Sequence, residues 1–185
     1  MKNLPSFFRP TLLALALATG FGLSACNKES DYTKELRKQE EAAKQADDTA
    51  IQAYLKRRNI TNYTRTESGL YLVPLAENTS VTEKIKKGQL VTVNYVGRLI
   101  GESNENTVFE SSSNSRQACG CYTFTAGNQS DPVARAGWQE AILLMKRGDR
   151  KILLIPSHLA YGAQPYGIVP VFTPLLYDIE VINVQ

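Results

Sequence analysis

The stretch GWQEAILLMKRGDRKILLIPSHLAYG, residues 137–162, decides the fold because it places a helix, a turn and a strand in immediate succession. Its apolar residues between positions 141 and 145 recur at helical spacing, which predicts a helix from Trp138 to Lys146. Gly148 follows two basic residues, a pattern typical of a helix C-terminus. The apolar run after it predicts a strand from Arg150 to Ile155.

Further strands flank this stretch on both sides. Strand-like runs occupy Gly69 to Leu75, Leu90 to Val96 and Leu175 to Val184. In the last run, positions 175, 177, 179 and 181 are apolar or aromatic, whereas Asp178 and Glu180 point the other way, as in a strand with one buried face. The sequence therefore predicts an α+β domain, a mostly antiparallel sheet packed on one helix.

Length and composition restrict the chain to one globular domain with an appendage. It has 185 residues, 43% hydrophobic and 21% charged, which excludes a disordered polymer and a multi-span membrane protein. The net charge of +3 comes from 21 basic and 18 acidic residues, and 19 basic residues remain without Lys2 and Arg9, which lie in a segment we expect to be removed. A chain this close to neutral lacks the basic stripe that nucleic acids require, so we predict no nucleic-acid partner.

The N-terminus has the pattern of an export signal. Lys2 and Arg9 flank the start of an apolar run, residues 11–23, which is too short and too interrupted by glycine to predict a transmembrane helix. The run ends in Leu-Ser-Ala-Cys, residues 23–26, which resembles the bacterial lipobox. The resemblance implies a signal peptide at 1–25 and an acyl chain on Cys26 that anchors the protein to a membrane of the cell envelope. Asn27 favours the outer membrane, with the domain in the periplasm or at the cell surface. The alternative is an ordinary secretory signal with a chance cysteine.

Residues 26–62 are predicted to form a helical spacer between the anchor and the domain. The part from Ser30 to Arg58 has no Gly or Pro and is dense in Glu, Lys, Gln and Ala, so we expect a helix. Ile51, Tyr54 and Leu55 follow helical spacing, which predicts that the C-terminal end docks while the N-terminal part stands in solvent. No heptad repeat is sustained, so association through this helix is the weaker alternative.

Two cysteines remain once Cys26 carries lipid. In an oxidising compartment Cys119 and Cys121 can form a disulfide, although such a short loop contributes little stability. Redox or metal chemistry is the alternative. Two thiols and the distant His158 fall short of four zinc ligands, so we predict no metal site.

Five blocks of sequence, in order, resemble the FKBP-type peptidyl-prolyl cis-trans isomerases. They are VTVNYVG at 91–97, VFESS at 108–112, GWQEA and MKRGD within 137–149, IPSHLAYG at 155–162, and GIVP with LLYDIEV within 167–181. The resemblance implies an FKBP-like fold for residues 63–185, an antiparallel twisted sheet wrapped on one central helix, with the helical spacer before it.

The resemblance also implies a site. Its catalytic group would be Tyr95, Phe109, Glu110, Trp138, Tyr161 and Tyr177, and its substrate-binding positions would be Tyr122, Arg135, Ile168 and Val169. Trp138 would lie under the prolyl ring, and the hydroxyl of Tyr161 would donate a hydrogen bond to a carbonyl of the substrate. The implied partners are X-Pro segments of exported polypeptides and macrolide inhibitors, with no cofactor.

The chemistry of such a site needs neither a nucleophile nor a metal. Rotation of the X-Pro amide is opposed by a barrier of about 18–20 kcal/mol that arises from the double-bond character of the C–N bond. The planar amide is more charge-separated than the twisted one, so dry apolar surroundings favour the twisted state. A single aromatic residue in a β-rich domain more often belongs to the core, but the order of these motifs favours a pocket.

Four departures from the family pattern leave two hypotheses. Glu110 stands where the family usually has Asp, Arg135 stands where it has an aliphatic residue, and the loop from Ser113 to Cys121 is enlarged. Tyr177 also replaces the usual Phe, so its hydroxyl needs a partner if it is buried. The intact aromatic residues favour an isomerase, whereas Arg135 and the loop favour a non-catalytic module that holds a peptide in the same pocket.

Overall fold

The computed structural model describes residues 30–114 and 118–185, so the predicted signal peptide and Cys26 lie outside the described residues. The elements in chain order are α1 (Asp31–Arg57), β1 (Thr64–Arg65), β2 (Tyr71–Ala76), β3 (Leu90–Leu99), β4 (Val108–Ser111), the short 3-10 helix η1 (Ser112–Asn114), β5 (Tyr122–Thr125), α2 (Ala136–Ile142), β6 (Arg150–Ile155), the 3-10 helix η2 (Ser157–Leu159) and β7 (Leu175–Val184).

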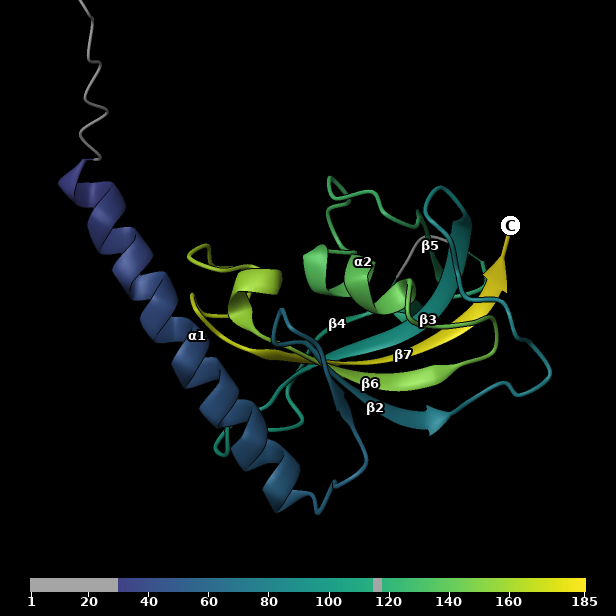
Figure 1. Ribbon diagram of the computed structural model, residues 1–185, viewed down its shortest axis with the longest axis horizontal. Helices are drawn as coiled ribbons and strands as arrows, with labels where there is room; N and C mark the ends of the chain where they lie inside the picture. The colour runs from purple at the N-terminus through teal and green to yellow at the C-terminus, as the bar shows by residue number, and fades with distance from the viewer. Residues whose placement is uncertain (1–29, 115–117) are drawn as a thin grey trace, which may run out of the picture.

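One antiparallel sheet forms the centre of the fold, which confirms the predicted α+β class (Figure 1). Its strands follow the order β1-β2-β6-β7-β3-β4, and β5 pairs with β3 beside that path. The long strand β3 changes its outer partner along its length, because its first residues pair with β5 and residues 96–98 pair with β4. This divided pairing brings β4 and β5, which both carry predicted site residues, against one strand.

The two faces of the sheet bury two separate cores, because successive side chains of a strand point to opposite sides. On β7, Tyr177 and Ile179 join the core under α2, whereas Leu176 joins the core under α1. Strands β2 and β6 divide in the same way. In Figure 1, α2 therefore lies on one face of the sheet and α1 crosses the other.

The helix α1 docks through its C-terminal half, as its spacing predicted. Ser30 caps its start by accepting a hydrogen bond from the backbone N–H of Thr33, and residues 31–46 are largely exposed. Ile51, Tyr54 and Leu55 are buried against the sheet. Burial of such side chains contributes about 1.5–3 kcal/mol each, which is enough to hold the helix in place. None of the helices in residues 30–114 and 118–185 is both long enough and apolar enough to cross a membrane.

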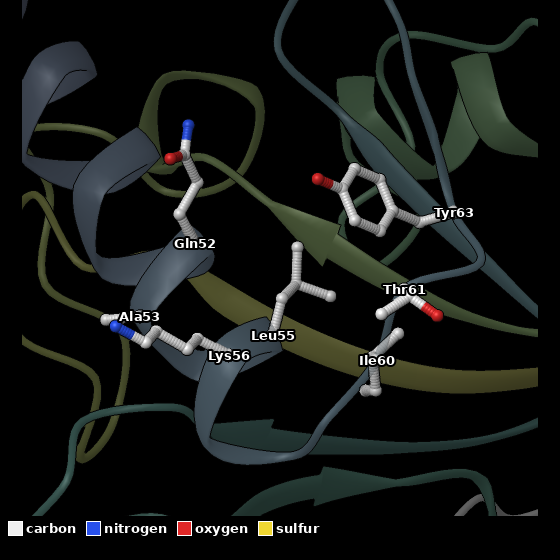
Figure 2. A pocket seen from close by; sticks show the side chains of 7 residues that line it. All are labelled: Gln52, Ala53, Leu55, Lys56, Ile60, Thr61 and Tyr63. Atoms are coloured by element: carbon white, nitrogen blue, oxygen red, sulfur yellow. The ribbon is translucent and has the colours of Figure 1, made fainter.

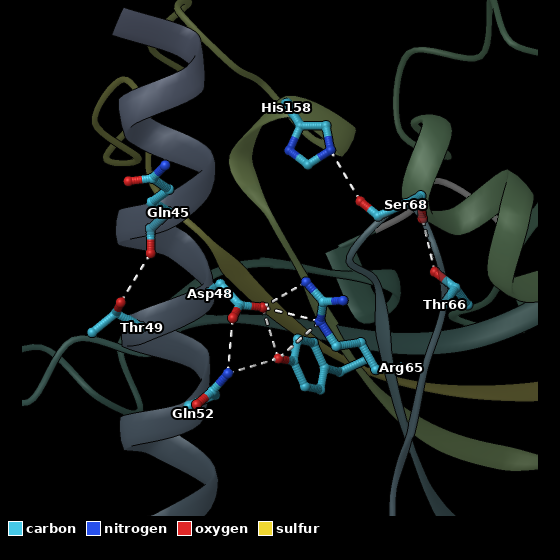
Figure 3. Close-up of polar contacts among 9 residues, drawn as sticks. Gln45, Asp48, Thr49, Gln52, Arg65, Thr66, Ser68 and His158 are labelled. Atoms are coloured by element: carbon cyan, nitrogen blue, oxygen red, sulfur yellow. Dashed lines mark hydrogen bonds and ion pairs between the residues drawn. The ribbon is translucent and has the colours of Figure 1, made fainter.

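Polar contacts fix the same helix beside its apolar contacts. The carboxylate of Asp48 accepts hydrogen bonds from the Tyr71 hydroxyl at 2.7 Å, from Arg65 Nε at 3.0 Å and from Gln52 Nε2 at 2.8 Å (Figure 3). Beyond these contacts, the last turn of α1 and the segment that follows it border a shallow hollow lined by residues such as Leu55, Ile60 and Tyr63 (Figure 2).

Several predicted bounds differ in the structure, and β3 continues to Leu99 beyond its predicted end at Val96. Helix α2 covers Ala136–Ile142 rather than Trp138 to Lys146, because the chain tightens after Ile142 into bonds such as Met145 N to Ile142 O, and the Asp149 carboxylate then accepts the N–H of Lys146. Strand β2 begins at Tyr71 rather than at Gly69, because Gly69 has a φ of 92° and closes a turn onto Thr66.

Candidate active site

Trp138 lies fully buried at the centre of the candidate site. It projects from α2, which approaches the sheet closely because Gly137 has no side chain, and a Cβ there would lie 2.5 Å from Cγ2 of Ile155. The Tyr95 and Tyr177 rings meet the indole edge-to-face, with centroids at 4.7 Å and 4.9 Å. Edge-to-face packing at this distance is favourable, so the two tyrosine rings hold the indole in place.

The walls of the site come from three neighbouring strands. Tyr95 on β3 and Tyr177 on β7 point to the same face of the sheet, and Phe109 on β4 packs edge-to-face on Tyr177 at 5.5 Å. The close approach of Phe109 depends on Gly97, since a Cβ at that position would lie only 2.7 Å from the Phe109 ring. A small residue on β3 therefore creates the space that the aromatic wall occupies.

Glu110 is the shared acceptor of three tyrosine hydroxyls. Tyr95 donates to its carboxylate at 2.9 Å, Tyr177 at 3.3 Å and Tyr161 at 3.4 Å. Tyr177 thereby finds the partner that a buried hydroxyl needs, and the longer Glu110 side chain stays within reach of the three tyrosines.

Burial raises the pKa of the Glu110 carboxyl above its usual value, while the three hydroxyls and the charge of Arg135 oppose that shift. Burial also raises the pKa values of all three tyrosines, which therefore remain protonated donors.

Tyr161 stands at the edge of this group, on the loop after η2. Its ring is half-buried, stacks on Tyr166 at 4.2 Å and lies under the guanidinium of Arg135 at 5.3 Å. The Nε of Arg135 and the indole Nε1 of Trp138 are both buried without a hydrogen-bond partner among the described residues. The backbone N–H of Arg135 donates to Val133 O at 2.8 Å in a three-residue turn.

The remaining predicted site residues divide between the wall and the rim. Val169 is fully buried in the core under α2, whereas Ile168 is 60% exposed at the surface. Tyr122 packs edge-to-face on Tyr95 at 6.2 Å and donates its hydroxyl to Asp131.

Cys119 and Cys121, just before Tyr122, are joined in a disulfide. His158 is exposed and contacts the carbonyl of Ser68. Within the described ranges, no three His, Cys, Asp or Glu side chains gather as a metal site would require.

Sequence reasoning missed two polar residues that shape the segment before α2. Asp131 accepts hydrogen bonds from the backbone N–H groups of Val133 and Ala134 as well as from Tyr122. Gln139 is fully buried and joins Gly127 N–H to Ala134 O. The Asp-Pro pair at 131–132 is a turn signal that could have indicated the first of them. Gln139 carries no local signal, because both of its partners lie outside its own helix.

Comparison with known proteins assigns the family. The family model described as FKBP-type peptidyl-prolyl cis-trans isomerase matches residues 81–182, more than half of the chain. This chain belongs to that family. The FKBP-type match spans β3 to β7 and therefore every residue of the aromatic site.

Relatives and solved structures agree with the FKBP-type assignment. The FK506-binding protein of Neisseria meningitidis serogroup C is 35% identical over 99 residues, which are 53% of this chain and 82% of that protein. The macrophage infectivity potentiator of Trypanosoma cruzi is 39% identical over 94 residues, 50% of this chain and 42% of that protein. A crystal structure of a peptidyl-prolyl cis-trans isomerase from Pseudomonas syringae pv. tomato aligns with a TM-score of 0.59 and 29% identity, covering 78% of this chain and 95% of that one. The chain spans only 6%, 66% and 42% of the length of three curated relatives that it matches.

Proposed function

We propose that the chain catalyses cis–trans isomerisation of X-Pro bonds in exported polypeptides, in the pocket around Trp138. The observation that carries this proposal is the indole floor, fully buried and walled by Tyr95 and Tyr177, with the hydroxyl of Tyr161 beside it. Because Trp138 is fully buried, a prolyl ring could rest on its indole only after a neighbouring side chain moved aside, and the amide would then lie at the edge of this apolar group.

Noncovalent stabilisation of the twisted amide is the chemistry that these residues support. The barrier of about 18–20 kcal/mol comes from amide resonance, which polar solvent strengthens and apolar surroundings weaken. Only contacts that are stronger in the twisted state than in the planar one accelerate the reaction. The aromatic rings supply the apolar surroundings, and the fixed hydroxyls hold the substrate in one orientation.

Tyr161 is the donor best placed to bind a substrate carbonyl. Its bond to Glu110 is long, at 3.4 Å, so little hydrogen-bond energy is lost when the hydroxyl turns to a ligand. Tyr95 and Tyr177 can keep their own bonds to Glu110 during this exchange. The carboxylate therefore retains partners while the substrate is bound.

The direct test is the cis-to-trans rate of a short X-Pro peptide, measured with the chain from Asn27 onward and repeated with FK506, the ligand in the names of relatives. We expect acceleration that FK506 blocks, and a loss of up to about tenfold for Tyr161→Phe, the effect of losing one hydrogen bond. Tyr32→Phe is the matched control, because Tyr32 is 78% exposed on α1, and it should retain the full rate. No acceleration by the folded protein would reject the proposal.

A non-catalytic peptide-binding or chaperone module is the second candidate. The observation in its favour is that Arg135 and Tyr166 both pack on the ring of Tyr161, the residue whose hydroxyl would bind the substrate. The same assay separates the two functions. Binding of the peptide without acceleration, observed through the fluorescence of Trp138, would favour this module.

We further propose that the domain is anchored through an acyl chain on Cys26 and acts outside the cytoplasm. The exposed part of α1, residues 31–46, would extend about 24 Å at 1.5 Å per residue and hold the site away from the membrane surface. Metabolic labelling with an alkynyl palmitate tests this anchor. Cys26→Ser should abolish labelling and release the protein from membranes, whereas equal labelling of both proteins would reject it.

A further inference from the structure

We propose that Asp47 on α1 is a positioning residue for the isomerase site, holding the loop that carries Tyr161 through Ser157; this inference rests on the proposed function. The N-terminal helix α1 would then help to position the isomerase site, in addition to its role as a spacer. Asp47 lies 110 positions before Ser157 in the sequence, yet the two side chains are in direct contact.

The contact is short, double and buried. Oδ2 of Asp47 accepts the backbone N–H of Ser157 at 2.8 Å and its hydroxyl at 2.6 Å, and both residues are 1% exposed. Hydrogen bonds to a carboxylate are stronger than neutral ones, and water does not compete for them here. Asp47 therefore fixes both the side chain and the backbone at the start of η2, where α1 runs past this turn (Figure 1).

Ser157 is hydrogen-bonded to both sequence neighbours of Tyr161. Its carbonyl accepts the N–H of Ala160 at 2.9 Å and the N–H of Gly162 at 2.8 Å. Gly162 O in turn accepts the N–H of Phe172 at 2.7 Å, which closes the loop from 162 to 172. The backbone on either side of Tyr161 is thus tied to one residue, and that residue is tied to α1.

Docking of α1 does not by itself require this buried carboxylate. The helix already buries Ile51, Tyr54 and Leu55, and Asp48 binds Tyr71 and Arg65 at the sheet (Figure 3). Burial raises the pKa of Asp47, and the hydrogen bonds from Ser157 oppose that rise. A carboxylate that is costly to bury and points at the Tyr161 loop is best explained by the position it imposes on that loop.

The test compares Asp47→Ala with Asp48→Ala in the full chain, at a temperature where both variants are folded. Both changes remove an α1 contact, but Asp48 contacts the sheet and not the loop. We expect kcat/KM for an X-Pro peptide to fall about tenfold in Asp47→Ala and to stay within twofold in Asp48→Ala, because small displacements of a catalytic group are costly. Equal effects of the two variants would overturn the proposal.

A double-mutant cycle shows whether Asp47 acts through Tyr161. In a Tyr161→Phe background, Asp47→Ala should cost less than threefold, because the group that it positions is already lost. The full tenfold loss in that background would contradict positioning of Tyr161. If Asp47→Ala does not fold, Ser157→Ala takes its place, since it removes the 2.6 Å bond and leaves the backbone one, and a smaller loss is expected.

Hydrogen exchange gives a readout that does not depend on turnover. The amide hydrogens of Ala160 and Gly162 should exchange at least tenfold faster in Asp47→Ala than in the wild type. Their exchange rates in Asp48→Ala should equal those of the wild type. Unchanged exchange in Asp47→Ala would overturn the proposal even if activity fell. Faster exchange in a protein without isomerase activity would reject the proposed function and leave the loop contact established.

Discussion

Gly97→Ala adds a single methyl group and should damage the pocket without touching any polar group. The added carbon would lie 2.7 Å from Cζ of Phe109 and 3.0 Å from Cε1 of Tyr177, whereas carbon atoms in contact settle at about 3.5–4.0 Å. The Phe109 ring must therefore move by about 1 Å. Phe109 is half-buried, so the ring can yield at a cost of about 1–3 kcal/mol in the free energy of unfolding.

The effect on the site should exceed the effect on the fold. A wall that moves by about 1 Å can cost up to about 100-fold in turnover, and we expect at least a tenfold loss in kcat/KM and in FK506 affinity. Trp138 is the single Trp in the sequence, so its fluorescence reports binding directly. Urea denaturation measures stability in the same samples.

Gly88→Ala is the matched control for this prediction. Gly88 has a φ of +89° and no heavy atom within 4 Å of a Cβ placed there, so alanine would cost about 1–2 kcal/mol through the backbone alone. Its stability should therefore fall as in Gly97→Ala, while affinity and turnover stay at the wild-type level. Wild-type binding and turnover in Gly97→Ala would refute the account of the Phe109 wall.

Three further predictions concern other parts of the fold. Because burial raises the pKa of Glu110 above its ordinary 4.5, the folded state keeps a proton that the unfolded chain releases, so stability should fall as pH rises from about 4.5 through the raised value. Glu110→Gln should flatten this part of a urea-denaturation pH profile, and an unchanged profile would contradict the shift. Ile51→Ala should lower the free energy of unfolding by about 2–5 kcal/mol, measured by denaturation against Tyr32→Ala, and a loss below about 0.5 kcal/mol would show that α1 is not docked. Reduction of the Cys119–Cys121 disulfide should lower the melting temperature only slightly, because the closed loop is so short, and complete unfolding on reduction would contradict this.

Local patterns in the sequence predicted the elements that carry their own periodicity. The alternation along residues 175–184 gave the two faces of β7, and the spacing of Ile51, Tyr54 and Leu55 gave the docking side of α1. The end of α2 was predicted too late, since Met145 fits the helical spacing but is buried from a turn that Asp149 stabilises. The side chain of Asp149 decides where the helix ends, and the apolar spacing of residues 141–145 gives no information about that hydrogen bond.

The aromatic residues of the candidate site could be predicted from the sequence, but the hydrogen bonds that connect them could not. The motifs placed Trp138 and the tyrosines in one group, and the structure brings them together. The convergence of three hydroxyls on Glu110 depends on four separate elements, so it required the assembled sheet. The bond between Asp47 and Ser157 joins segments 110 residues apart, and no spacing rule applies at that distance.

Exchange NMR on an X-Pro peptide with a catalytic amount of the protein tests the central claim most directly. One sample then gives both the cis–trans exchange rate of the peptide and, at higher protein concentration, the indole N–H resonance of Trp138. We expect accelerated exchange, a shift of that resonance on peptide binding, and loss of both effects when FK506 is added. A folded protein that leaves the exchange rate unchanged, or that accelerates it without any shift at Trp138, would contradict the account.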